Sequence, residues 1–169
     1  MLLRRPLCAV LLAAALLAGC GGEDDAGPQT KEGFISAADN VCQDMFSEFA
    51  QVGDGQPTTP AGVADANNEL ADTYAKLADR LEDVRLPDEG AARTRAQAFV
   101  KSVRAAEPLL DRLRAASKRF VDAGQKKDRE ALTKAGNDVR AALDAFRSAR
   151  AESDRLAIAY GLNFCGNLG

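Results

Sequence analysis

Residues 60–84 read PAGVADANNELADTYAKLADRLEDV, and the spacing of their apolar side chains decides the fold. A Thr followed by a Pro, as at Thr59 and Pro60, is a typical helix start. The apolar side chains then recur at helical spacing: Val63, Leu70, Tyr74, Leu77, Leu81 and Val84. This period predicts an amphipathic α-helix, which Leu86-Pro87 ends.

Three further segments show the same helical period, and no stretch alternates apolar and polar residues with a period of two. The predicted helices span about 34–51, 59–84, 88–123 and 128–160. The sequence therefore predicts an all-α domain, most simply an antiparallel four-helix bundle with long third and fourth helices.

Two residues in the third segment carry local predictions. Pro108 falls opposite the apolar stripe, so we expect it to bend this helix around the core without breaking it. Gly124 follows the last apolar turn, and we expect it to cap the helix. The second segment is acidic and the third is basic, so we expect the two helices to attract each other.

The composition excludes several classes of function. The formal net charge of −3 argues against a nucleic-acid-binding protein. The chain has no His, the commonest catalytic base and metal ligand, and we predict no catalytic residue, metal site or cofactor. Five acidic residues of the second helix lie far from its apolar stripe and are expected to face solvent: Asp65, Glu69, Asp72, Asp79 and Asp83. Tyr74 and Tyr160 lie on apolar stripes and are interpreted as packing residues with their hydroxyls at the rim.

The N-terminus has the pattern of a signal peptide. Two Arg precede an apolar run of 13 residues, 7–19, which is too short to span a membrane. The run ends in Leu17-Ala18-Gly19-Cys20, which resembles the lipobox of bacterial lipoproteins. The resemblance implies that residues 1–19 are removed and that Cys20 carries acyl chains, such as palmitate, on the extracytoplasmic face of the cell membrane. The alternative is an ordinary secretory signal that is cleaved after Ala18 or Gly19.

Three regions follow from this interpretation. Residues 1–19 form the signal peptide, and residues 20–32 form the lipidated Cys and a polar, Gly-rich flexible tether. Residues 33–169 form the helical bundle domain. The membrane, reached through the lipid anchor, is the first predicted partner.

Two further cysteines, Cys42 and Cys165, lie near opposite ends of the folded part. In a compartment that permits disulfides we expect them to be joined, and the alternative is two free thiols. Two thiolates without His do not make a zinc site, and no Cys-x-x-Cys motif is present. In an up-down-up-down bundle the tail from Gly161 to Cys165 reaches back about as far as Cys42.

A second resemblance involves the sequence around these cysteines. Residues 34–42, FISAADNVC, and the ending Gly161-Leu162-x-x-Cys165-Gly166 are similar to those of small actinobacterial lipoproteins without an assigned function. The resemblance implies a disulfide-pinned helical bundle and supplies no catalytic residues.

We interpret the protein as a non-catalytic interaction or structural module of the cell envelope. The alternative is a binding module for a small apolar or envelope-derived ligand inside the bundle, and an enzyme would have to work with carboxylates alone. The long third and fourth helices are expected to project outward and to offer a surface to an envelope protein partner. The residues of this predicted surface are Phe120, Val121, Lys126, Lys127 and Leu132. The competing hypothesis is that the 51–62 connection, or a tilt at Pro108, covers this surface. The oligomeric state stays open.

Overall fold

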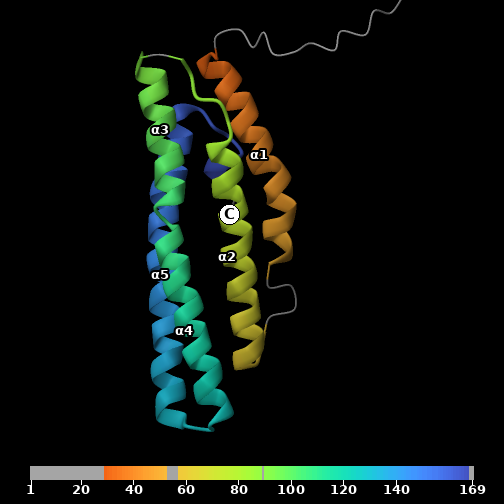
Figure 1. Ribbon diagram of the computed structural model, residues 1–169, viewed down its shortest axis with the longest axis vertical. Coiled ribbons are helices and arrows are strands. Elements are labelled where there is room, and N and C mark those ends of the chain that lie inside the picture. Colours follow the sequence, from red (N-terminus) through yellow and green to blue (C-terminus); the bar gives the residue numbers. More distant parts are fainter. Residues whose placement is uncertain (1–28, 53–56, 89, 168–169) are drawn as a thin grey trace, which may run out of the picture.

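The computed structural model describes residues 29–52, 57–88 and 90–167, and its ordered elements are helices (Figure 1). In chain order they are α1 (Lys31–Gln51), α2 (Pro60–Glu82), α3 (Gly90–Arg104), α4 (Glu107–Gln125), α5 (Arg129–Tyr160) and the 3-10 helix η1 (Cys165–Asn167). No strand occurs in these ranges, which confirms the prediction of an all-α domain.

The helices lie side by side along one long axis. Figure 1 shows that the chain reverses direction between α1 and α2, between α2 and α3, and between α4 and α5. α5 runs back along α4 and then along α3, while α2 packs on α4 and α1 packs on α2. α1 accompanies only the half of the domain next to α3, and α2, α4 and α5 continue without it into the other half.

Local capping explains where the helices begin and end. The side chains of Thr30, Thr59 and Asp128 accept hydrogen bonds from backbone N–H groups in the first turns of α1, α2 and α5. Gly161 ends α5 in the left-handed conformation, at φ 106°. Gln29 exchanges two hydrogen bonds with Asp88, so residues 29–32 belong to the folded domain and not to the tether.

The expectation that Pro108 bends one long helix without breaking it is wrong. α3 ends at Arg104 and α4 begins at Glu107, with a turn at residues 105–106. Proline has no N–H to donate to the carbonyl of residue 104, four positions earlier, and its ring crowds that carbonyl. The break therefore falls where the missing bond would have formed, and Pro108 takes the first turn of α4.

Gly124 has a different role from the predicted one. It lies inside α4, which continues to Gln125, and the left-handed residue of this turn is Lys127, at φ 56°. A Cβ on Gly124 would lie 3.0 Å from the ring of Pro60. The missing side chain thus lets the start of α2 approach the end of α4, and α2 covers one side of the α4–α5 hairpin.

Aromatic side chains join α1 to the seam between α2 and α5. The ring of Phe34 meets Tyr160 edge-on at 5.6 Å. Tyr74 of α2 meets Phe146 of α5 at 5.0 Å, and Phe49 of α1 packs on Tyr74 at 6.4 Å. Both tyrosines are buried, which confirms their packing role. The hydroxyl of Tyr160 is buried too, without a partner among the described residues, and does not reach the rim as expected.

The C-terminal segment is locked to α1 by a disulfide and by one carboxylate. Cys42 and Cys165 are bonded, as predicted. Next to them, the buried side chain of Asp39 accepts hydrogen bonds from the backbone N–H groups of Asn163, Phe164 and Cys165, at 2.9, 3.0 and 3.2 Å. We call these contacts the Asp39 clamp. The clamp satisfies three amide groups that lack acceptors in a helix, because Asn163 and Phe164 lie between α5 and η1 and Cys165 is the first residue of η1.

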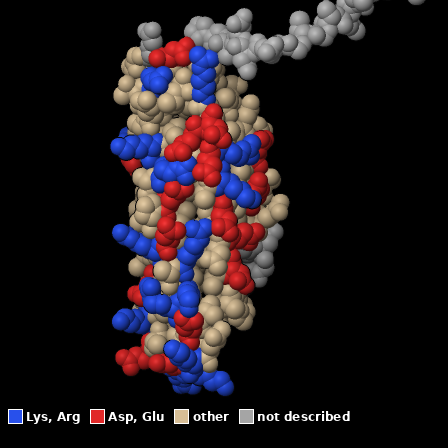
Figure 2. Space-filling view, viewed as in Figure 1, with Lys and Arg blue, Asp and Glu red and all other residues tan. Residues whose placement is uncertain are grey.

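Ion pairs connect the acidic α2 to the basic α3 and α4, and Figure 2 shows the two signs alternating along this face. Arg104 reaches Asp79 at 2.8 Å, Glu82 at 2.5 Å and Glu107 at 2.6 Å. Arg114 reaches Asp72 at 2.6 Å. The expected attraction between these helices is confirmed, and it holds them in register more than it stabilises them.

Candidate functional site

The largest groove described lies between α2 and α5, with α4 as its floor. Its volume is about 610 Å³, and we call it the α2–α5 groove. Apolar side chains from all three helices line it, with polar and basic ones on the α5 side: Val63, Phe120, Leu132, Thr133, Gly136, Asn137, Val139, Arg140, Leu143 and Arg147.

The groove exists because α1 is shorter than its neighbours. In the first half of the domain α1 covers the α2–α5 seam, and its last aromatic contact is that of Phe49 with Tyr74. Further along the seam, Leu143 and Val139 on α5 and Val63 on α2 line the groove. The groove is therefore the place that a longer α1, or a helix of another chain, would occupy.

The rim of the groove on α5 is basic. Arg140 and Arg147 are exposed, and both have weak partners on their own helix. Arg140 lies 3.5 Å from the amide oxygen of Asn137, and Arg147 lies 3.3 Å from the carboxylate of Asp144. Such exposed contacts break easily, so both guanidinium groups are available to an acidic partner.

The five residues of the predicted partner surface are not brought together. Phe120 and Leu132 line the α2–α5 groove, where both are half-buried. Val121 lines a separate groove of about 470 Å³ between α2 and α4. Lys126 and Lys127 are exposed at the α4–α5 turn, the basic end of the molecule in Figure 2. The hairpin does not project freely as expected, because α2 reaches Gly124.

Sequence reasoning misses the residues that form most of the groove. The apolar spacing assigns Val63 and Val139 to the core, and it does not single out Leu143, Arg140 or Arg147. The available signal is a difference in length, since the predicted first helix is shorter than the second by about eight residues. This difference in length indicates a groove only when it is also known that α1 covers the α2–α5 seam.

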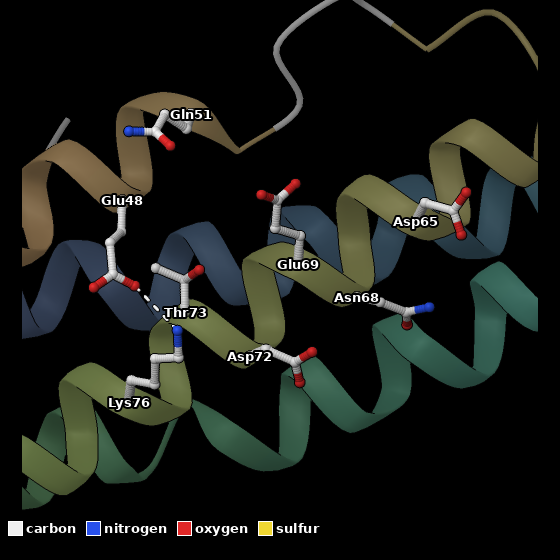
Figure 3. Close-up of a pocket in the computed structure, with 8 residues that line it drawn as sticks. All are labelled: Glu48, Gln51, Asp65, Asn68, Glu69, Asp72, Thr73 and Lys76. Carbon is white, nitrogen blue, oxygen red and sulfur yellow. Dashed lines mark hydrogen bonds and ion pairs between the residues drawn. The ribbon is translucent and has the colours of Figure 1, made fainter.

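A second groove, of about 480 Å³, is acidic (Figure 3). Glu48 of α1 and Lys76 of α2 are paired across it at 3.2 Å. Asp65, Glu69 and Asp72 line its α2 wall and are exposed, as predicted for a solvated face. In the part of the chain that the structure describes, no three Cys, Asp or Glu side chains are placed to hold a metal ion.

Among the described residues, the space beside Tyr74 and Phe99, where the alternative interpretation would place a ligand, is small. The space enclosed beside Tyr74, Phe99 and the disulfide is about 10 Å³, room for about one water molecule. Burial raises the pKa of Tyr74 to about 12, so its hydroxyl stays protonated in this packed region. The hypothesis of a small apolar ligand inside the bundle therefore gains no support.

No known protein family, curated protein or solved structure matches this chain. None of the helices in residues 29–52, 57–88 and 90–167 is both long and apolar enough to span a membrane. Cys20 and residues 1–19 lie outside the described residues.

Proposed function

We propose that the protein is a lipid-anchored component of the bacterial cell envelope, held at the extracytoplasmic face of the cell membrane. Its helical domain binds an envelope protein there and catalyses no reaction. In this proposal the domain is an antiparallel four-helix bundle in which α3 and α4 together form one long, bent third member. The observation that carries the binding role is the apolar α2–α5 groove with its basic rim.

The anchor rests on the sequence alone. A 13-residue apolar run behind two Arg, ending in Leu-Ala-Gly-Cys, fits lipidation of Cys20. The Cys20→Ala variant should lose lipid labelling and leave the membrane fraction of cells. Cys8→Ala, in the same apolar run, is the matched control and should change neither. A membrane pool that is unaffected by Cys20→Ala would exclude the lipid anchor.

The groove suits an amphipathic helix with acidic residues along one edge. Such a helix would place its apolar face on Val63, Phe120 and Leu143. α1 packs in the same way on the neighbouring part of the α2–α5 seam, where Phe49 contacts Tyr74. Its acidic edge would meet Arg140 and Arg147, which supports a protein partner over a purely apolar ligand.

Charge reversal on the rim tests this without disturbing the core. We expect Arg140→Glu with Arg147→Glu to reduce partner capture from intact cells at least tenfold, with unchanged folding. The matched control is Arg129→Glu with Lys134→Glu, which reverses two exposed charges of α5 outside the groove. Equal capture by the two double variants would contradict the role of the groove.

A further inference from the structure

The exposed large apolar side chains of the described residues gather around η1. They are Phe46 of α1, Ile158 of α5 and Phe164, with 53%, 58% and 48% of their surfaces exposed. Phe46 and Phe164 form the two sides of one shallow groove of about 390 Å³, whose other lining residues are Gln43, Asn163 and Asn167. Ile158 also lies beside η1, packed directly against Gly166. We call Phe46, Ile158 and Phe164 the η1 patch.

The patch is held rigidly at the surface. The disulfide fixes Cys165 next to Phe164, and the Asp39 clamp binds the backbone N–H of Phe164 itself. These constraints fix the backbone at Phe164, whose ring is half exposed. Two independent constraints keep an aromatic side chain in water, where it costs free energy unless something covers it.

We propose that the η1 patch rests on the lipid bilayer that carries the anchor, an inference that depends on the lipid-anchored state proposed above. The first support is the length of the chain that joins the lipid anchor to the folded domain. The nine residues from Cys20 to Pro28 span at most about 30 Å when extended. Phe46 lies about 22 Å along α1 from Lys31, at 1.5 Å per residue, so the bilayer surface is within range of the patch.

The second support is the chemistry of the groove between the two Phe. Its polar lining consists of neutral amides, with no charge to desolvate. Exposed Phe side chains beside neutral polar groups suit the boundary between lipid headgroups and acyl chains, where apolar side chains insert.

The third support is size. The three exposed side chains offer roughly 300 Å² in total, taking roughly 200 Å² for a fully exposed large apolar side chain. A specific protein interface needs about 800 Å² from each partner, so the patch is too small for a stable dimer of this chain. An anchored domain stays at high effective concentration near the bilayer, where a weak contact suffices to orient it.

The absence of Trp from the chain gives a direct test. Full-length lipidated Phe46→Trp and Phe164→Trp variants are reconstituted in phosphatidylcholine–phosphatidylglycerol vesicles, with or without brominated acyl chains. We expect bromine to quench both tryptophan emissions at least twofold. Lys134→Trp, exposed at the other end of the domain, is the control and should lose less than a tenth of its emission.

Each other result overturns the inference. Quenching at neither patch position, or equal quenching at position 134, means that the patch does not contact lipid selectively. If the emission of the Phe46→Trp variant changes with protein density but not with bromine, a second copy covers the patch. Failure of the lipid anchor can be distinguished from failure of the patch, because without the anchor the unsubstituted chain would not remain with the vesicles.

Discussion

The two ends of the domain are closed by different means. At one end α1, the last turns of α5 and η1 are joined by a disulfide and by the Asp39 clamp. At the other end α2, α4 and α5 meet through a close approach of Gly124 to Pro60, without α1 and without a covalent link. The first end leaves an apolar patch on a rigid surface, and the second leaves an open groove.

This difference separates two tasks. The end that follows the proposed membrane tether is fixed in shape, which suits a surface that rests on a bilayer. The far end leaves the α2–α5 seam uncovered where α1 stops, which suits the capture of a helix. Variants that act on one end only test this division.

The largest effect should come from the disulfide. It closes a loop with a sequence separation of 123, so its loss in Cys42→Ala with Cys165→Ala should lower the free energy of unfolding by about 4–5 kcal/mol. Alkylation of the non-reduced protein should detect no free thiol at either position, and reduction should reproduce the loss. Reductant should have no effect on the double variant, and full labelling without reductant would contradict the bond.

Removal of the Asp39 clamp should have the next largest effect. Asp39→Ala leaves three backbone N–H groups without their acceptor, and we expect the oxidised protein to lose about 3 kcal/mol in denaturant unfolding. Asp44→Ala removes an exposed carboxylate of the same helix, paired only with Arg80, and should be close to neutral. Equal losses for the two variants would show that the clamp does not stabilise this end.

Two glycines test the packing of the groove end, and they should differ in sign. Gly124→Val places a branched side chain against Pro60 and should cost about 2 kcal/mol. A Cβ on Gly136 would meet Phe120 at 3.4 Å, an ordinary contact, so Gly136→Ala should stabilise by about 0.5–1 kcal/mol through helix propensity. A gain in thermal stability from both variants would mean that α2 does not press on α4.

The smallest effect concerns Arg104 between α2 and the α3–α4 turn. Hydrogen bonds from Arg104 lower the pKa of Glu82 below its ordinary value of 4.5. A lowered pKa contributes stability above pH 4.5, and this contribution disappears as the pH falls through the lowered value. Arg104→Gln should therefore lower the melting temperature slightly at about pH 7 and less at about pH 3. A difference that grows on acidification would contradict the ion pair.

Much of the fold was predictable because its signals are local. Apolar spacing and the capping residues Thr59 and Asp128 place the helices to within a few residues. The break before Pro108 was not predicted, because the position of Pro108 opposite the apolar stripe favours a bend, although the carbonyl four residues earlier loses its donor. The pairing of Cys42 with Cys165 followed from the predicted compartment and the predicted helix order.

The remaining features depend on contacts between distant segments. Asp39 binds residues more than 120 positions away, and nothing in its local sequence marks it as a clamp. The local sequence around Gly124 suggests a helix cap, and only the position of α2 beside it shows its packing role. The groove depends on which seam α1 covers, and helix lengths alone do not say this.

The α2–α5 groove is the proposed partner-binding face, and site-specific photo-crosslinking in intact cells tests this role most directly. A photoreactive residue at Thr133, in the groove, is compared with one at Ala145, an exposed position of α5 outside it. We predict one discrete adduct from position 133, lost when Arg140 and Arg147 are changed to Glu, and none from position 145. No adduct at position 133, or the same adducts from both positions, would contradict the account.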